Sequence, residues 1–135
     1  MTASPTATIR LSPVGKFAYS WGEFLTWCGD HVDPAADPWV LYPFGLVGPA
    51  ALPSLLGPVI YAAVPSRDAC QYVGQTMDLR DRFRKHAAVP GRRESFAYVV
   101  ICPLVDIAQG YLDQAESLAA DILRPAEGDR HPRRR

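Results

Sequence analysis

The chain lacks any long hydrophobic run, and no apolar stretch in its 135 residues approaches the roughly 18 that a membrane-spanning helix needs. Its N-terminal residues, MTASPTATIRLSPVGK, also lack the charged-then-apolar order of a secretory signal peptide. We therefore expect a cytoplasmic protein. At this length, we expect one domain that buries a single core and needs no disulfide bond or structural metal to stabilise it.

Cysteine is scarce, and its arrangement excludes two classes of stabilised fold. The three cysteines, Cys28, Cys70 and Cys102, are odd in number and far apart, with no C-x-x-C pair and no histidine at ligand spacing. A disulfide framework or a zinc site would need paired or clustered ligands. We predict that each cysteine is a small buried hydrophobic residue.

The net charge is zero, because 14 basic side chains balance 14 acidic ones. Overall charge therefore gives no argument for a nucleic-acid partner. The distribution is uneven, however, since residues 58–95 hold seven basic and four acidic side chains and the last six residues hold four arginines. This pattern indicates either a local basic footprint or a solvated helix face with a basic tail.

The clearest secondary structure lies between Gly57 and His86. Residues 59–64 are apolar and rich in strand formers, and turn residues follow at 65–68. A second short strand is predicted over 70–73, with Gly74 at its end. Asp78 is predicted to cap an amphipathic helix that runs over 79–88.

Four further segments surround this stretch. A helix is predicted over 20–28, with Ser20 as its cap, and another over 106–123, with Asp106 as its cap. Six prolines within 34–58 predict an extended segment lying on the core, with a turn of helix near 52–56. The apolar run 96–102 predicts a strand buried on both faces. This order predicts an α+β fold, in which helices cover a small sheet.

Polar side chains cluster within these elements. Tyr61 and Tyr72 fall on neighbouring strands, and Arg82 and His86 are one helical turn apart on the same helix face. Glu116 lies at the apolar edge of the long helix. Taken singly, each residue also fits an ordinary structural role. Together they suit phosphodiester hydrolysis, because a carboxylate can bind Mg²⁺, an arginine can neutralise a phosphate, and a phenol near positive charge can act as a base.

The pattern of these residues resembles a known family of nucleases. The triplet Val-Ile-Tyr ending at Tyr61 is separated by ten residues from Tyr72-Val73-Gly74, and Asp78-Leu79-x-x-Arg82-Phe83-x-x-His86 follows. With Glu116 and the later Leu-Arg-Pro at 123–125, this is similar to the GIY-YIG nuclease superfamily over residues 55–125. The resemblance implies a three-stranded antiparallel sheet flanked by helices.

The resemblance also implies a role for each residue. Tyr61 would be the general base, and Tyr72 would hydrogen-bond near the attacking water or the phosphate. Arg82 would stabilise the phosphate, and His86 would assist in proton transfer or phosphate contact. Glu116 would bind a single Mg²⁺ or Mn²⁺.

The sequence departs from the family pattern at three places. Val59 replaces the glycine of the first triplet, and Gln75 stands where some members carry a lysine. The asparagine that often follows the last proline is absent after Pro125.

The expected activity is a Mg²⁺-dependent endonuclease that hydrolyses DNA, alone, as a homodimer or with a targeting protein. Residues 1–54 are expected to form an extension packed on the core, 55–125 the catalytic domain, and 126–135 a basic, disordered tail. The alternatives are a catalytically weak module that binds nucleic acid or protein, and an enzyme for a small phosphorylated substrate. The residues expected to contact nucleic acid are Arg80, Arg84, Lys85, Arg92 and Arg93.

Overall fold

The computed structural model describes residues 8–65 and 69–127, and these form a mixed α+β fold around a three-stranded antiparallel sheet. The strands are β3 (Leu56–Val64), β4 (Tyr72–Asp78) and β5 (Tyr98–Pro103), in the order β4-β3-β5. The central strand β3 pairs with both neighbours, so β4 is an edge strand. This confirms the predicted fold class of helices around a small sheet.

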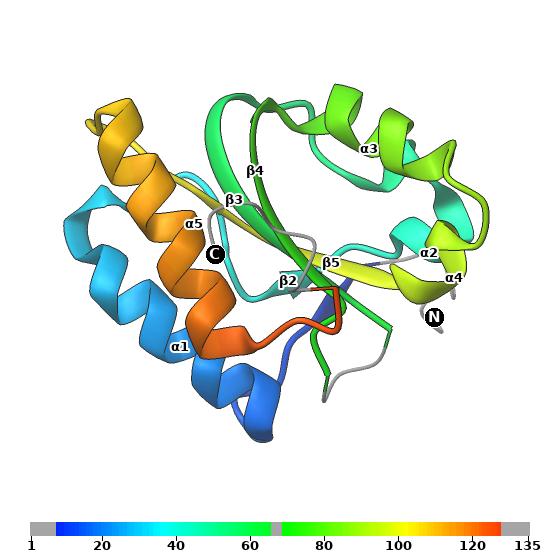
Figure 1. Cartoon of the computed structure of the whole chain (residues 1–135), viewed down its shortest axis with the longest axis horizontal. Coiled ribbons are helices and arrows are strands. Elements are labelled where there is room, and N and C mark those ends of the chain that lie inside the picture. The colour runs from blue at the N-terminus through cyan, green and yellow to red at the C-terminus, as the bar shows by residue number, and fades with distance from the viewer. Residues whose placement is uncertain (1–7, 66–68, 128–135) are drawn as a thin grey trace.

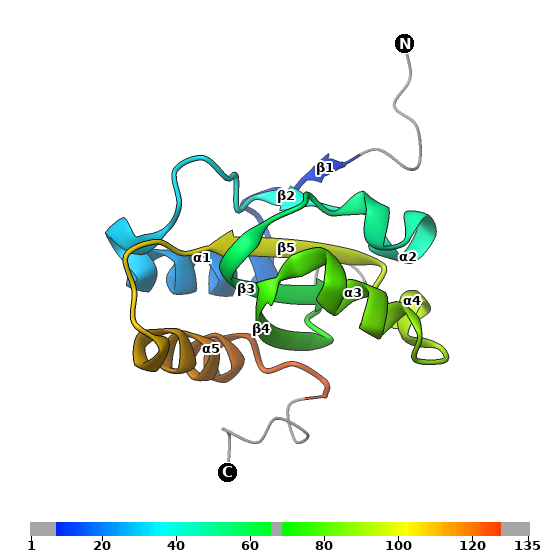
Figure 2. The same ribbon diagram turned by 90° about the horizontal axis from the view of Figure 1, so that it is seen from above.

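Within the described residues, the five helices α1–α5 cover the two faces of this sheet (Figures 1 and 2). On one side α1 (Lys16–Cys28) packs against α5 (Gln109–Leu123). On the other side lie α2 (Phe44–Val47), α3 (Leu79–Ala87) and α4 (Arg92–Ser95). The sheet is therefore buried from both sides, which explains the continuous apolar character of β5.

Side chains of β3 alternate between two core clusters, as the two-residue period of a strand requires. Ile60, Ala62 and Val64 join the cluster that contains α1 and α5, whereas Tyr61 and Ala63 join the cluster that contains α3. This alternation assigns Tyr61 to the α3 side of the sheet.

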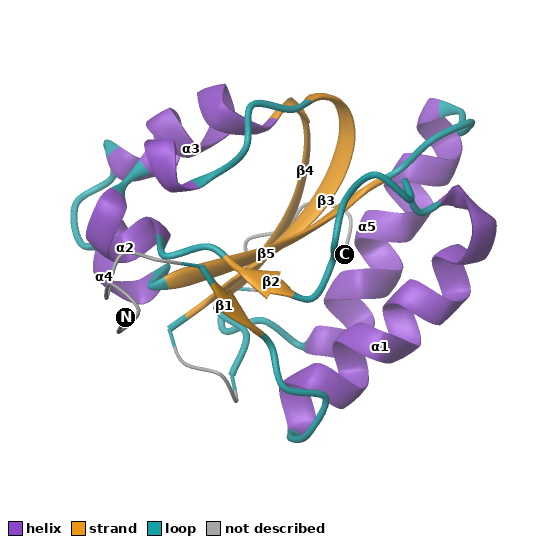
Figure 3. Ribbon diagram, turned by 180° about the vertical axis from the view of Figure 1, so that it is seen from behind, coloured by secondary structure: helices purple, strands orange, loops and turns teal. Residues whose placement is uncertain are grey.

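The proline-rich segment is ordered, as predicted, and it lies along the sheet. A small ribbon pairs β1 (Ile9–Arg10) with β2 (Val40–Leu41), and an isolated bridge joins Tyr42 to Val99 of β5 (Figure 3). Two single-turn 3₁₀ helices, η1 (Gly29–His31) and η2 (Pro49–Ala51), complete the described elements. The helical turns therefore precede the predicted position at 52–56, because that stretch leads directly into β3.

Three predicted boundaries are wrong. Helix α1 begins at Lys16 and not at Ser20, because Phe17 is buried and anchors an additional turn. Gly74 does not end the second strand, since β4 continues to Asp78 by pairing with β3. Asp106 has a left-handed backbone (φ 56°) and does not cap α5, which begins three residues later without a side-chain cap.

The cysteine prediction is confirmed, since all three residues are buried and have free thiols. Within the described ranges, none of the helices has the length and apolar character needed to cross a membrane.

Candidate active site

Tyr61 is the centre of a cluster of aromatic and basic side chains on the α3 side of the sheet. Its side chain has no exposed surface and lies edge-on to Phe83, with ring centroids 4.8 Å apart. The ring of Tyr72 from β4 is stacked nearly parallel to it at 6.1 Å. Neighbouring strands thus bring the two predicted tyrosines together.

Helix α3 brings two polar groups to the Tyr61 hydroxyl. The Tyr61 Oη atom is 2.8 Å from His86 Nε2, and the Arg82 guanidinium lies near enough to the same phenol to lower its pKa. Asp78 caps this helix as predicted, accepting a hydrogen bond from the backbone N–H of Asp81 at 3.1 Å. The one-turn spacing of Arg82 and His86 therefore places both on the face that meets β3.

Gly74 allows the Tyr61 ring to lie directly across the edge strand. The two residues are opposite each other in the β3–β4 register. A Cβ atom at position 74 would lie 2.6 Å from Tyr61 Cζ and still closer to the hydroxyl oxygen. Only a glycine leaves room for the phenol there, so this residue belongs to the site and not to a turn.

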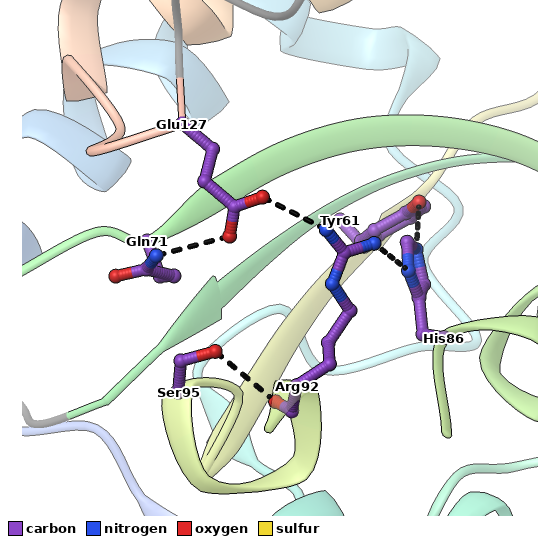
Figure 4. Close-up of polar contacts among 6 residues, drawn as sticks. All are labelled: Tyr61, Gln71, His86, Arg92, Ser95 and Glu127. Carbon is purple, nitrogen blue, oxygen red and sulfur yellow. Dashed lines mark hydrogen bonds and ion pairs between the residues drawn. The ribbon is translucent and has the colours of Figure 1, made fainter. Parts of the chain in front are cut away.

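Arg92 extends the cluster from α4. Its Nη1 atom is 3.1 Å from His86 Nδ1, and its guanidinium lies over the rings of Tyr72 and Phe96 at 5.5 and 5.1 Å from their centroids. Its Nη2 atom forms an ion pair with Glu127 at 2.8 Å (Figure 4). Arg92 therefore connects the C-terminal segment to the imidazole at the centre of the site.

Glu127 lies within residues 126–135, which are predicted from the sequence to form a disordered tail. The backbone N–H groups of Ala126 and Glu127 donate to the carbonyls of Cys70 and Gln71. The Glu127 Oε2 atom also accepts a hydrogen bond from Gln71 Nε2 at 2.9 Å. Residues 126 and 127 are therefore ordered, and the rest of the predicted tail, 128–135, lies outside the described residues.

Burial and neighbouring charges shift the pKa values of the central pair. Burial raises the pKa of Tyr61 well above its usual value of 10, with a further contribution from Tyr72, while the Arg82 guanidinium acts in the opposite direction. Burial, together with the positive charges of Arg92 and Arg82, lowers the pKa of His86 to about 4. The imidazole is therefore neutral at pH 7.

Glu116 approaches the cluster from α5 on the other side of the edge strand. Its carboxylate is almost fully buried, and its Oε1 atom accepts a hydrogen bond from Gln75 Nε2 at 2.6 Å. The same Gln75 nitrogen also donates to Asp113 Oδ1 at 2.9 Å. The negative charge of Glu116 contributes to the raised pKa of Tyr61, so the carboxylate and the phenol interact electrostatically.

Two of these contacts carry a signal in the sequence that the predictions did not use. Asp113 and Glu116 are three residues apart on one helix, so they share a face, and one amide from β4 can reach both. The link between Arg92 and Glu127 has no such local signal, because 35 residues separate the partners.

The five residues expected to contact nucleic acid do not form one exposed surface. The side chains of Arg84 and Lys85 are 64% and 73% exposed, and both form ion pairs with Asp81. Arg80 and Arg93 donate to backbone carbonyls of other segments, and Arg92 is mostly buried in the site. Arg92 and Arg93 lie in helix α4.

Comparisons of the chain with protein-family models, with curated proteins and with solved structures find no match.

Proposed function

We propose that this protein is a metal-dependent nuclease that hydrolyses DNA phosphodiester bonds through a site of the GIY-YIG type. The observation that carries the proposal is the gathering of Tyr72, Arg82 and His86 around the Tyr61 hydroxyl. The buried carboxylate of Glu116 acts on the same phenol from α5. These are the five residues that the family resemblance assigns to catalysis.

In the proposed reaction Tyr61 acts as the base. Its phenolate takes one proton from a water molecule, and the resulting hydroxide forms a new bond to phosphorus while the bond to the leaving oxygen breaks. The leaving oxygen then takes a proton from solvent. Because burial raises the pKa of Tyr61, the phenolate depends on positive charge, which the nearby Arg82 guanidinium supplies.

Arg82 is the group that can stabilise the phosphate. A guanidinium presents several N–H donors in a fixed plane, so one edge can bond the Tyr61 hydroxyl while another contacts phosphate oxygens. His86 is neutral near pH 7 and therefore acts as a hydrogen-bonding partner, not as a cationic acid.

Glu116 is the residue that would hold a divalent cation, and the donor chemistry around it fits a hard cation. The carboxylates of Glu116 and Asp113 share one amide donor from Gln75, so hard oxygen ligands lie close together. In the part of the chain that the structure describes, no group of three or more histidine, cysteine or acidic residues forms a metal cluster. Mg²⁺ is commonly held by one or two carboxylates, with water and substrate oxygens completing its shell, and it would add positive charge near the phosphate.

A second candidate function is a module that keeps this fold and binds nucleic acid or protein with little catalysis. Two observations favour it. Tyr61 has no exposed surface, and Gln75 hydrogen-bonds the Glu116 oxygen that would be needed for a cation.

The test is DNA cleavage by the wild-type protein and by three variants. Plasmid and branched DNA are incubated with Mg²⁺ or Mn²⁺, and we expect Tyr61→Phe, Arg82→Ala and Glu116→Gln each to lower the cleavage rate by about 100-fold or more. Asp121→Asn is the control for Glu116→Gln, because it changes an exposed carboxylate on the same helix and should cut normally. Circular dichroism and urea unfolding verify that each variant is folded.

Cutting that persists in all three variants would overturn the site assignment. If the wild-type protein does not cut but binds DNA with a steep salt dependence, the binding module is the correct function.

A further inference from the structure

A chain of polar contacts runs from Glu127 through Arg92 and His86 to Tyr61. Every link is a short contact between side chains from different elements: 2.8 Å from Glu127 to Arg92, 3.1 Å from Arg92 to His86, and 2.8 Å from His86 to Tyr61 (Figure 4). Its end at Tyr61 is fully buried, and Arg92 and Glu127 have side chains only 18% and 11% exposed. Solvent therefore does little to loosen these contacts.

The direction of each hydrogen bond follows from the chemistry of arginine. A guanidinium has only N–H donors and stays protonated, so Arg92 donates and His86 Nδ1 must accept. A neutral imidazole that accepts at Nδ1 carries its proton on Nε2. The contact of His86 Nε2 with Tyr61 then has the imidazole as donor and the phenol oxygen as acceptor.

This direction matters because a phenol beside a neutral imidazole would otherwise donate its own proton to the ring. With Arg92 in place, Tyr61 Oη accepts from His86 and lies close to the positive charge of Arg82. Its own proton is then not held by His86, and the oxygen left by its loss is stabilised by the His86 N–H donor and by the nearby charge of Arg82. A hydrogen bond to the charged form favours that form.

We propose that Arg92, anchored by Glu127, is a positioning residue that holds His86 in the Nε2–H tautomer and thereby prepares Tyr61 to act as a phenolate. The tautomer is a property of the folded chain, whereas its value in catalysis rests on the proposed nuclease function. Arg92 itself is assigned no contact with substrate.

The geometry of Glu127 supports its role as the anchor. One carboxylate oxygen accepts from Arg92 and the other from Gln71, and the backbone N–H of Glu127 donates to the Gln71 carbonyl. Residue 127 is thus fixed by two side-chain contacts and one backbone contact, and the guanidinium cannot turn from His86 without breaking the ion pair.

The direct test is ¹⁵N NMR of the histidine rings, which distinguishes a protonated ring nitrogen from an unprotonated one. In the wild-type protein at pH 7, we expect the His86 signals of a neutral ring with the proton on Nε2. In Arg92→Met, a flexible apolar side chain can still pack on Tyr72 and Phe96. We expect a new set of signals with the proton on Nδ1, because Tyr61 can now donate to Nε2.

Two further variants separate positioning from packing. Arg92→Lys retains a donor and a charge, so we expect it to restore the Nε2–H tautomer at least in part. Glu127→Gln leaves Arg92 intact, but the amide can no longer accept from both Arg92 and Gln71. We expect this variant to shift part of the His86 ring proton from Nε2 to Nδ1, by less than Arg92→Met does. Other rings also face His86, namely Tyr72, Phe83 and Phe96, and none of these variants alters them.

The cleavage assay supplies the second readout. If the proposed function holds, Arg92→Met should lower kcat about tenfold with little change in KM, since one interaction of about 1.4 kcal/mol corresponds to that factor. A wild-type ring with its proton on Nδ1, or an Arg92→Met protein with an unchanged tautomer, overturns the inference. If the tautomer responds as expected and no variant or wild-type protein cuts DNA, the positioning stands and the nuclease function fails.

Discussion

The site depends on the absence of a side chain at Gly74. A methyl group at this position would lie inside the van der Waals radius of the Tyr61 ring, which is fully buried and has no space to retreat. We expect Gly74→Ala to destabilise the protein by about 1–3 kcal/mol, the usual cost of overpacking a core. Urea unfolding measures this.

Gly110 provides the matched control for that substitution. It lies in α5, and a Cβ atom there would meet nothing within 4 Å. We expect Gly110→Ala to stabilise the protein by about 0.5–1 kcal/mol, because alanine favours the helix. Equal destabilisation by both changes would contradict the close approach of Tyr61 to Gly74.

The buried imidazole of His86 predicts how stability changes with pH. Its pKa is about 4 in the folded protein and 6.5 in the unfolded chain, so the unfolded chain binds an additional proton between these values. The groups that face it are Tyr61, Tyr72, Arg82 and Arg92. The neutral ring therefore contributes up to about 3 kcal/mol above pH 6.5, and this contribution is lost as the pH falls toward 4.

Urea unfolding of the wild-type protein and of His86→Gln between pH 4.5 and 7.5 measures this contribution. The glutamine does not titrate, so the difference in unfolding free energy between the two proteins should shrink as the pH falls. A difference that stays constant over this range would show that the ring takes up its proton equally in both states.

Among the elements, helix α3 carries the largest part of the site, and its first residue is fixed by a cap. The Asp78 carboxylate accepts from the backbone N–H of Asp81. We expect Asp78→Ala to lower stability by about 1 kcal/mol, whereas Asp78→Asn should lower it much less, because asparagine also caps well. Thermal unfolding compares the two, and equal losses would mean that charge and not capping is responsible.

The same helix shows which elements could be predicted from the sequence. Asp78 followed by an apolar pair at Leu79 and Phe83 is a local signal, and the observed helix begins where that signal places it. The start of α1 could not be found in this way, because it depends on the burial of Phe17 by distant segments. Gly74 was read as a strand end because a glycine usually interrupts a strand, whereas here the partner strand and Tyr61 require it.

Within the candidate site, local sequence spacing was enough to predict that Arg82 and His86 lie together. It was not enough to predict the contacts made by residues from distant segments. A helical period places two side chains on one face, and the structure brings both to Tyr61. The contact of Arg92 with Glu127 joins residues 35 positions apart. The spacing of residues close in the sequence does not specify which distant carboxylate will pair with Arg92.

For the whole molecule, the N-terminal segment is part of the core. Trp21 and Phe24 of α1 are fully buried in the cluster that α5 and the sheet share. Removing them would expose that side of the core, and burial of one large apolar side chain contributes about 1.5–3 kcal/mol. We expect a chain that begins at Leu55 not to unfold cooperatively.

Circular dichroism during urea unfolding and the dispersion of NMR signals test this expectation. The control is a chain that begins at Thr8, which retains every residue that the structure describes and should unfold as the full chain does. Cooperative unfolding of the chain that begins at Leu55 would show that residues 55–127 are an independent domain.

The attachment of Glu127 to Gln71 and Arg92 has a consequence for the order in which the protein matures on the ribosome. Synthesis runs from the N-terminus, so β3, β4 and α3 emerge before the carboxylate that anchors Arg92. A nascent chain can thus form the contact between Tyr61 and His86 while the guanidinium is still unanchored. If Arg92 sets the tautomer of His86 as we propose, the hydrogen-bond direction at Tyr61 is fixed only after Glu127 has bound Arg92.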